Sequence, residues 1–490
     1  MIQNGNKKER HALPRWNSIE TAEKLGELGS ARIIRQPQHS FSASELTGLL
    51  GEWKNEKNLP LAVEIISAAK LSQSEEDISD VVQFAKKAIL NIQDTNPLLK
   101  ELIFDSPTRK TYETDTHQVS IEKIKKSLVE YPRNPLLWSE LSREYTILGQ
   151  EQKSKKAIQV AFALAPENRT VLRAISRFYA HIGDIEQASF YLRNSPLIKS
   201  DPWILSAEIA LSNESGRTSR NIKHAQKMIL DANYHPLALS ELASELGTMD
   251  FLAGNNRQGK RKLEVAVKQP HENAVAQIAW INKNTCNVEA IISGLQTPAC
   301  NFEAETRWFF DAEEWKKALD VSGRWQEYQP FSREPAIVSS FIATDFLMDY
   351  KKAEETLRCG LKSNPNDCNL LNNYIYVLAL DDQLTQAMTV LERAQRLCNS
   401  SDNISLIATS GLLCYRLGNP DLGRQQYLSA IDAAKKINDQ DSHYRAILCL
   451  AREEKRQGNS IVELMKQIED PKYAFLHKQY ETLIQNFKLV

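Results

Sequence analysis

The chain has 490 residues, of which 42% are hydrophobic and 25% charged, an ordinary balance for a soluble protein. Its 61 basic and 62 acidic residues give a formal net charge of -1, so no overall basic field favours nucleic acid. No apolar run approaches the roughly 20 residues that span a bilayer, and the polar segment 1–10 lacks a signal-peptide core. Seven cysteines lie between Cys286 and Cys449 without a C-x-x-C pair. We interpret them as buried thiols of a cytoplasmic protein.

Residues 1–41 differ from the rest of the chain because basic side chains outnumber acidic ones there. Pro14 and Pro37 bracket a predicted helix that begins near Ser18. We interpret this region as a basic, partly ordered arm that caps the first repeat, since chain ends are commonly loose. The alternative is an arm that docks on a partner, with Trp16 as its anchor.

A first two-helix unit is predicted at about 43–76. It begins with the capping box Ser42-x-x-Glu45, and its apolar residues then follow helical spacing. Degenerate helices come next, and the polar stretch 106–117 predicts a surface loop. The helical register returns at Ser120, shortly before the region in which the pattern is clearest.

The strongest pattern lies between Pro135 and Pro202, where a motif of 34 residues occurs twice. Residues that match after 34 positions are Trp138 and Leu172, Leu141 and Ile175, Ser142 and Ser176, Tyr145 and Tyr179, Gly149 and Gly183, Ser154 and Ala188, and Ile158 and Leu192. A fixed period of this length is typical of a stacked-repeat protein.

Each period predicts two short helices joined by a turn at Gly149 or Gly183. Ser142 and Ser154 are small residues at the expected crossing of the two helices. Small residues there allow the helix axes to approach to roughly 8–10 Å. One such hairpin cannot bury its apolar face alone, so neighbouring hairpins must stack on it.

The residues W-x-x-L-S-x-x-Y, then Gly, then S-x-x-x-I-x-x-A and Pro resemble the tetratricopeptide repeat. The resemblance implies an all-α fold, a right-handed superhelical solenoid of helix hairpins with a concave groove that binds peptides or partner proteins. An amphipathic pattern over 471–490 predicts a C-terminal capping helix for the open end of the stack.

The array continues after Pro202, but the spacing between successive repeats varies. The small position of the second helix can be followed as Ala188, Ala225, Gly259, Ala290, Ala318, Ala353, Ala387 and Gly423. Spacing is irregular around Ala290, which predicts a bend or a discontinuity of the superhelix there. The expected organisation is the arm at 1–41, an N-terminal repeat with degenerate helices and a loop at 42–134, an array at 135–270, irregular helical repeats at 271–332, a C-terminal array at 333–470 and the capping helix at 471–490.

No phosphate-loop, zinc-binding or nucleophile motif occurs, and the nine histidines are dispersed. We therefore expect no enzyme activity, no metal and no cofactor; an enzyme with a dispersed active site is the weakest hypothesis. The cluster of Trp308, Trp315 and Trp325 is interpreted as helix-packing core rather than as a platform for bases. No direct nucleic-acid binding and no membrane insertion are predicted.

The resemblance implies that the second, fifth, ninth and twelfth positions of each first helix line the groove. These positions include Arg143, Arg173 and Arg177, whose guanidinium groups are expected to converge and to hold the carboxylates of an acidic partner. The pattern resembles part of a carboxylate clamp but lacks its asparagines. The alternative is that the arginines pair with nearby acids, such as Glu140, Glu144 or Glu208, on a solvated face.

A second candidate groove patch consists of Asn372 and Tyr376, at the fifth and ninth positions of the repeat near 368–400. These side chains would offer hydrogen bonds to an extended backbone. The leading functional hypothesis is a non-enzymatic scaffold or adaptor that binds a partner protein or peptide in the groove. The alternative is a ligand- or peptide-responsive sensor subunit that controls an associated effector, with 271–332 as its hinge.

Overall fold

The computed structural model describes residues 13–19, 43–55, 113–231, 233–284, 300–398 and 403–468, with single positions between 57 and 84 and between 288 and 298. Regular secondary structure in these residues is helical, which confirms the all-α prediction. The chain divides into two compact units, which we call the N-terminal unit (residues 8–304) and the C-terminal unit (residues 305–490, with 1–7). The predicted capping helix and Ala290 lie outside the described residues.

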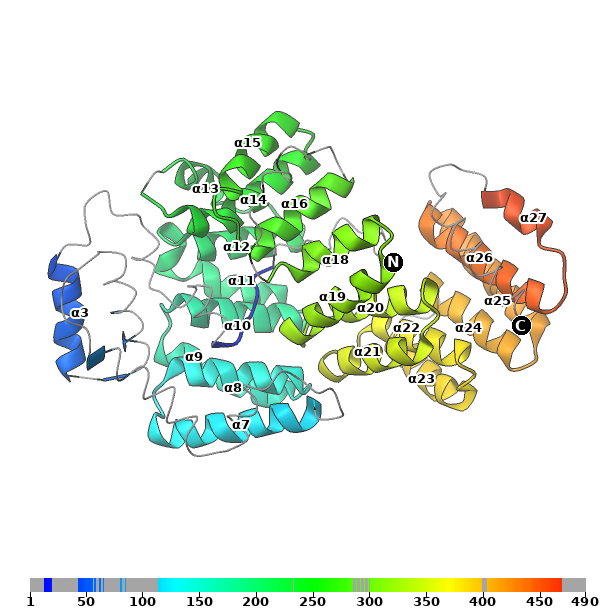
Figure 1. The fold of residues 1–490 in the computed structure, drawn as a ribbon, viewed down its shortest axis with the longest axis horizontal. Helices are drawn as coiled ribbons and strands as arrows, with labels where there is room; N and C mark the ends of the chain where they lie inside the picture. The colour runs from blue at the N-terminus through cyan, green and yellow to red at the C-terminus, as the bar shows by residue number, and fades with distance from the viewer. Residues whose placement is uncertain are drawn as a thin grey trace. The chain divides into compact units, whose positions relative to one another are not determined.

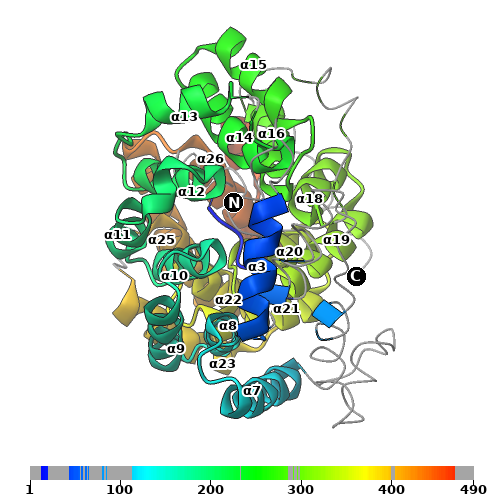
Figure 2. The same cartoon turned by 90° about the vertical axis from the view of Figure 1, so that its left-hand side faces the viewer.

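The N-terminal unit is built from helix hairpins that stack in chain order from α7 to α15 (Figures 1 and 2). Its helices are α3 (Ala43–Asn55), α7 (Glu113–Glu130), α8 (Pro135–Ile147), α9 (Glu151–Leu164), α10 (Arg169–His181), α11 (Ile185–Arg193), η1 (Pro196–Lys199), α12 (Pro202–Glu214), α13 (Ile222–Met228), α14 (Pro236–Leu252), α15 (Asn256–Ala266) and α16 (Glu272–Asn284). Helix α7 already begins at Glu113, so the loop predicted at 106–117 is wrong for its last five positions.

The C-terminal unit repeats the same arrangement. Helix α18 (Phe302–Asp311) contains the boundary between the units, and it is followed by α19 (Trp315–Tyr328), α20 (Glu334–Asp345), α21 (Tyr350–Ser363), α22 (Cys368–Leu380), α23 (Leu384–Leu397), α24 (Ile404–Arg416), α25 (Pro420–Lys436), α26 (Gln440–Arg456), α27 (Val462–Met465) and η2 (Lys466–Ile468). Polar N-cap residues explain why several of these helices begin where they do. Asp367, for example, accepts bonds from the backbone of Asn369 and Leu370 at the start of α22.

Small residues lie where the two helices of a hairpin cross, as the 34-residue pattern predicted. Ser142 and Ser154 are fully buried and their hydroxyl oxygens are 2.8 Å apart. The same spacing recurs as Gly247 with Gly259 and as Gly411 with Gly423. These crossings confirm the predicted array of helix hairpins.

The interpretation of the cysteines needs correction. Cys368 and Cys398 form a disulfide, because they lie at the start of α22 and just after the end of α23, where the two ends of one hairpin meet. Four further cysteines are half-buried rather than buried: Cys300, Cys359, Cys414 and Cys449. The prediction of a cytoplasmic location rested on free thiols, so it loses that support.

Candidate functional site

The inner face of the N-terminal unit, formed by the first helices of its hairpins, holds a segment of the chain's own arm. This arm segment, residues 13–19, is dark blue in Figure 1, and its residues 14–18 have no regular secondary structure. Asn273 of α16 donates from Nδ2 to the Leu13 carbonyl oxygen at 3.3 Å. Arg143 of α8 donates from Nε to the Trp16 carbonyl oxygen at 3.2 Å. The segment thus extends from α16 to α8, with the Trp16 side chain 4% exposed.

Arg143 and Arg173, two of the candidate arginines, form the following ion pairs within the unit. The Nη1 atom of Arg143 is 3.1 Å from Oε1 of Glu144. Arg173 donates from both Nη atoms to the two carboxylate oxygens of Glu241 on α14, at 2.8 and 3.2 Å. The guanidinium groups of Arg143 and Arg173 therefore bond to different elements, while Arg177 is half-buried. An acidic partner at these arginines stays a prediction, and it would compete with buried internal carboxylates.

Glu241 is the centre of a charged cluster on this face. His271 lies 2.9 Å from Glu241 through Nδ1, and Asn273 donates to the same oxygen, also at 2.9 Å. Burial alone would raise the pKa of Glu241, but Arg173 and His271 hold that pKa well below the usual glutamate value. The carboxylate therefore stays ionised in the folded protein.

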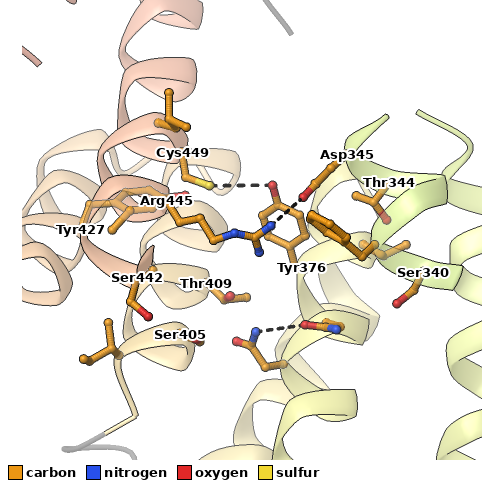
Figure 3. Close-up of a pocket in the computed structure, with 18 residues that line it drawn as sticks. Ser340, Thr344, Asp345, Tyr376, Ser405, Thr409, Tyr427, Ser442, Arg445 and Cys449 are labelled. Atoms are coloured by element: carbon orange, nitrogen blue, oxygen red, sulfur yellow. Dashed lines mark hydrogen bonds and ion pairs between the residues drawn. The ribbon is translucent and has the colours of Figure 1, made fainter. Parts of the chain in front are cut away.

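The C-terminal unit carries a cavity of about 110 Å³ (Figure 3). It is lined by successive turns of the first helices α20, α22, α24 and α26, and by Tyr427 of α25. Lining residues on α22 are Asn372, Asn373, Tyr376 and Val377, which share one face because they recur at helical spacing. The structure thus places both predicted residues of the second patch, Asn372 and Tyr376, in one cavity.

One ion pair borders this cavity. Figure 3 shows Arg445 of α26 reaching toward Asp345 at the end of α20, with Nη2 3.3 Å from Oδ2. The Arg445 guanidinium also lies 4.6 Å from the ring centroid of Phe341. Burial raises the pKa of Asp345, although Arg445 and Arg452 oppose this shift. Asp345 and Arg445 keep 18% and 26% of their side chains exposed, so this pair remains accessible to a ligand.

Three lining residues carry a buried polar atom with no hydrogen-bond partner among the described residues. These atoms are Oγ1 of Thr344, Oδ1 of Asn372 and the phenolic oxygen of Tyr427. An unpaired buried polar group costs about 1–3 kcal/mol. Three such atoms around one cavity indicate a site where a bound polar group is expected to complete the hydrogen bonds.

The thiol and the phenols around the cavity are held in their neutral forms. Burial raises the pKa of the Cys449 thiol and raises the pKa of the Tyr376 and Tyr427 phenols well above their usual values. A thiol with a raised pKa is a poor nucleophile. Arg452 donates to the Tyr376 oxygen at 2.8 Å, which fixes this phenol at the cavity wall. The arrangement is suited to hydrogen bonding rather than to nucleophilic attack.

Two charged residues of the cavity, Asp345 and Arg445, were missed by the sequence analysis. The groove positions implied by the resemblance could have found them. Gly149 is the positive-φ turn residue of its hairpin and stands fifteenth in its repeat. Counting back in the same way from the turn residues Met348 and Gly458 puts Asp345 at the twelfth and Arg445 at the second position.

Comparisons with known proteins add little to this geometry. The crystal structure of yeast Tom70 is similar at 15% identity and a TM-score of 0.31, over 82% of this chain and 97% of that chain. Human IFIT1, in a dimer with PPP-AAAA, is similar at 12% identity and a TM-score of 0.37, over 74% of this chain and 96% of that chain. No protein-family model and no curated protein matches the chain. With scores this low, neither similarity supports an argument about function.

None of the described helices combines the length and apolarity that a membrane span requires. The described His, Cys, Asp and Glu side chains form no group of three or more that could hold a metal ion.

Proposed function

We propose that this chain is a non-enzymatic scaffold that binds a partner protein, and that the cavity of the C-terminal unit receives an extended segment of that partner. The observation that carries the proposal is the set of three buried polar atoms, on Thr344, Asn372 and Tyr427, for which the described residues supply no hydrogen-bond partner. The cavity is smaller than the roughly 300–1,000 Å³ of sites that enclose a small molecule. Its size therefore favours a side chain or a short stretch of backbone.

The chemistry of the lining favours a peptide. The free carbonyl oxygen of Asn372 accepts a backbone N–H, and the Tyr427 phenol donates to a backbone carbonyl. The Asp345–Arg445 pair offers both charges to a polar side chain of the partner. We infer a partner segment that is extended, since backbone groups of a helix are already bonded within it.

The test is an affinity purification that compares Asn372→Ala with Asn369→Ala. Both asparagines belong to α22, but Asn369 is exposed and does not line the cavity, so it is the matched control. We expect a partner to be lost from Asn372→Ala and kept by Asn369→Ala, with helicity unchanged in both. Identical partners from both variants would remove the cavity from the proposal.

The charge reversal of Arg143, Arg173 and Arg177 belongs in the same experiment. An acidic partner bound at these arginines would be lost from that variant, provided that the protein still folds. The alternative of a ligand-responsive sensor predicts a change of shape on ligand binding. An unchanged solution-scattering profile at saturating ligand would contradict the sensor.

A further inference from the structure

The inner face of the N-terminal unit is chemically unlike the cavity, because it is already filled. We propose that this face binds an extended peptide in which an arginine precedes a tryptophan, and that the arm segment 13–19 is its intramolecular occupant, which a partner segment of the same chemistry displaces. The proposal concerns the N-terminal unit alone, and it does not depend on the cavity of the C-terminal unit.

The first support is recognition of the arm's backbone by side chains of the repeats. Arg143 and Asn273 donate to carbonyl oxygens of the arm, and Glu140 accepts from the Ile19 N–H at 3.2 Å. Bonds to backbone atoms do not depend on which residues the segment carries. Another extended segment can therefore make the same three bonds.

The second support is a socket with a defined charge. Arg15 lies between two carboxylates: its Nε atom is 3.6 Å from Oε1 of Glu272, and its Nη2 atom bonds to Glu303. These two glutamate side chains are only 4% and 5% exposed. Buried carboxylates strongly favour a cation beside them. The occupant of this face is therefore basic, which is opposite in sign to the acidic partner expected from the groove arginines.

The third support is an incomplete fit at Asn273. Its Nδ2 atom donates to two acceptors, the Leu13 carbonyl oxygen and Oε1 of Glu241, and this fixes the orientation of the amide. The Oδ1 atom is buried and has no hydrogen-bond partner among the described residues. Pro14, which follows Leu13, has no N–H to offer. A partner segment with an N–H at this place gains a bond that the arm lacks.

Displacement of residues 14–18 breaks no helix, because these residues belong to none, although Ile19 at the end of the arm segment is helical. Elements with few regular hydrogen bonds open at lower free energy than the helical core. The arm segment can thus leave the inner face while the hairpins stay stacked, as an exchangeable ligand must.

The experiment measures binding of a fluorescein-labelled peptide with the sequence of residues 11–20 to the full chain by fluorescence anisotropy. In the Arg15→Glu/Trp16→Ala chain the tethered competitor is weakened, so we expect the peptide to bind at least about tenfold more tightly than to the wild-type chain. A peptide with the same two substitutions should bind neither protein. Arg220→Glu, an exposed charge reversal in the same unit, should behave as wild type.

Equal affinity of the peptide for the wild-type chain and the folded double variant would overturn the proposal, as would no binding to either. A wild-type dimer that the double variant turns into a monomer would assign the arm to a second copy and overturn intramolecular occupancy. Should the double variant not fold, hydrogen exchange on the wild-type chain decides. Excess tagged peptide should raise exchange of the arm segment several-fold, and unchanged exchange at saturation would refute displacement.

Discussion

The inner faces of the two units differ although the hairpins behind them are built alike. In the N-terminal unit, Arg173 and Glu241 form a bidentate ion pair, and the arm segment covers the face. In the C-terminal unit, the corresponding surface contains a cavity and buried polar atoms that have no hydrogen-bond partner in the part of the chain that the structure describes. The N-terminal face is thus covered by the arm segment, although Oδ1 of Asn273 lacks a partner among the described residues, whereas the C-terminal face has three such atoms around a cavity.

This difference separates stability from binding. A bonded, buried charge is held in place, and removing its partner destabilises the fold. An unpaired buried group instead favours a ligand that completes its bonds. The same repeat architecture can therefore support either role. The side chains at the groove positions determine whether a face contributes to stability or binds a ligand.

The largest expected effect is at Arg173. Arg173→Met leaves Glu241 ionised and buried without its main partner, so we expect a loss of about 3–5 kcal/mol in the free energy of unfolding. Arg445→Met removes a partly exposed pair and should cost about 1 kcal/mol or less. Urea denaturation of both variants measures this contrast. Equal costs would mean that the two faces do not differ in the way proposed.

The pH dependence of stability should also differ between the two faces. Because the pKa of Glu241 in the folded protein lies below its usual value of 4.5, the folded state binds this proton less readily than the unfolded state. Its contribution to stability is present above that value and is lost as the pH falls below it. The stability difference between wild type and Glu241→Gln should therefore shrink between about pH 5 and about pH 3. For Asp345→Asn the dependence has the opposite sign, because burial raises the pKa of Asp345.

A smaller effect on stability tests whether the helix crossings of the two units are packed alike. A Cβ atom at Gly259 would lie 2.8 Å from the Phe251 ring and 3.1 Å from the Gly247 carbonyl oxygen. At Gly423 it would lie 2.5 Å from the Tyr415 ring and 2.9 Å from the Gly411 carbonyl oxygen. Alanine at either position should cost about 1–3 kcal/mol, measured by thermal or chemical unfolding.

The control for these two substitutions is Gly323→Ala in α19, where a Cβ atom meets nothing within 4 Å. Alanine there should be neutral or stabilising, since it favours the helix. A costly change at only one of the two crossings would show that the units differ in their scaffolds as well as in their faces.

The fold was predictable where local spacing determines it. Ser142 and Ser154 lie on adjacent helices, so a short repeat places both at the crossing. The same rule located Ala188, Ala353 and Ala387, which are all fully buried. The loop before Ser120 was misjudged, because polar composition alone does not exclude the first turn of a helix, where α7 begins.

The candidate site was predictable only in part. Asn372 and Tyr376 share a turn of one helix, so a position rule found them. The docking of the arm joins Trp16 to Arg143 across 127 residues, and no periodicity contains that contact. The arginine pattern alone predicted an acidic partner, whereas the contacts of Arg173 depend on which acid the stacking of α14 brings to it.

The smallest expected effect on stability is at Tyr427, and it separates the two roles of a buried phenol. The Tyr427 hydroxyl has no partner among the described residues, so Tyr427→Phe removes an unpaired buried group and should not lower the free energy of unfolding. Tyr415 is the matched control, because its hydroxyl donates to Glu454, whose pKa its contacts lower to about 2. Tyr415→Phe should cost about 1.5–3 kcal/mol in the same denaturation experiment.

Binding should respond to these two substitutions in the reverse order. A partner that pairs with the Tyr427 phenol loses a hydrogen bond in Tyr427→Phe, whereas Tyr415 does not line the cavity. A Tyr427→Phe chain that is as stable as wild type but binds its partner more weakly would identify the phenol as a binding group. A loss of stability equal to that of Tyr415→Phe would instead mean that the protein itself satisfies this hydroxyl. The Tyr427 hydroxyl would then not be available to a partner. In that respect the C-terminal face would no longer differ from the N-terminal face.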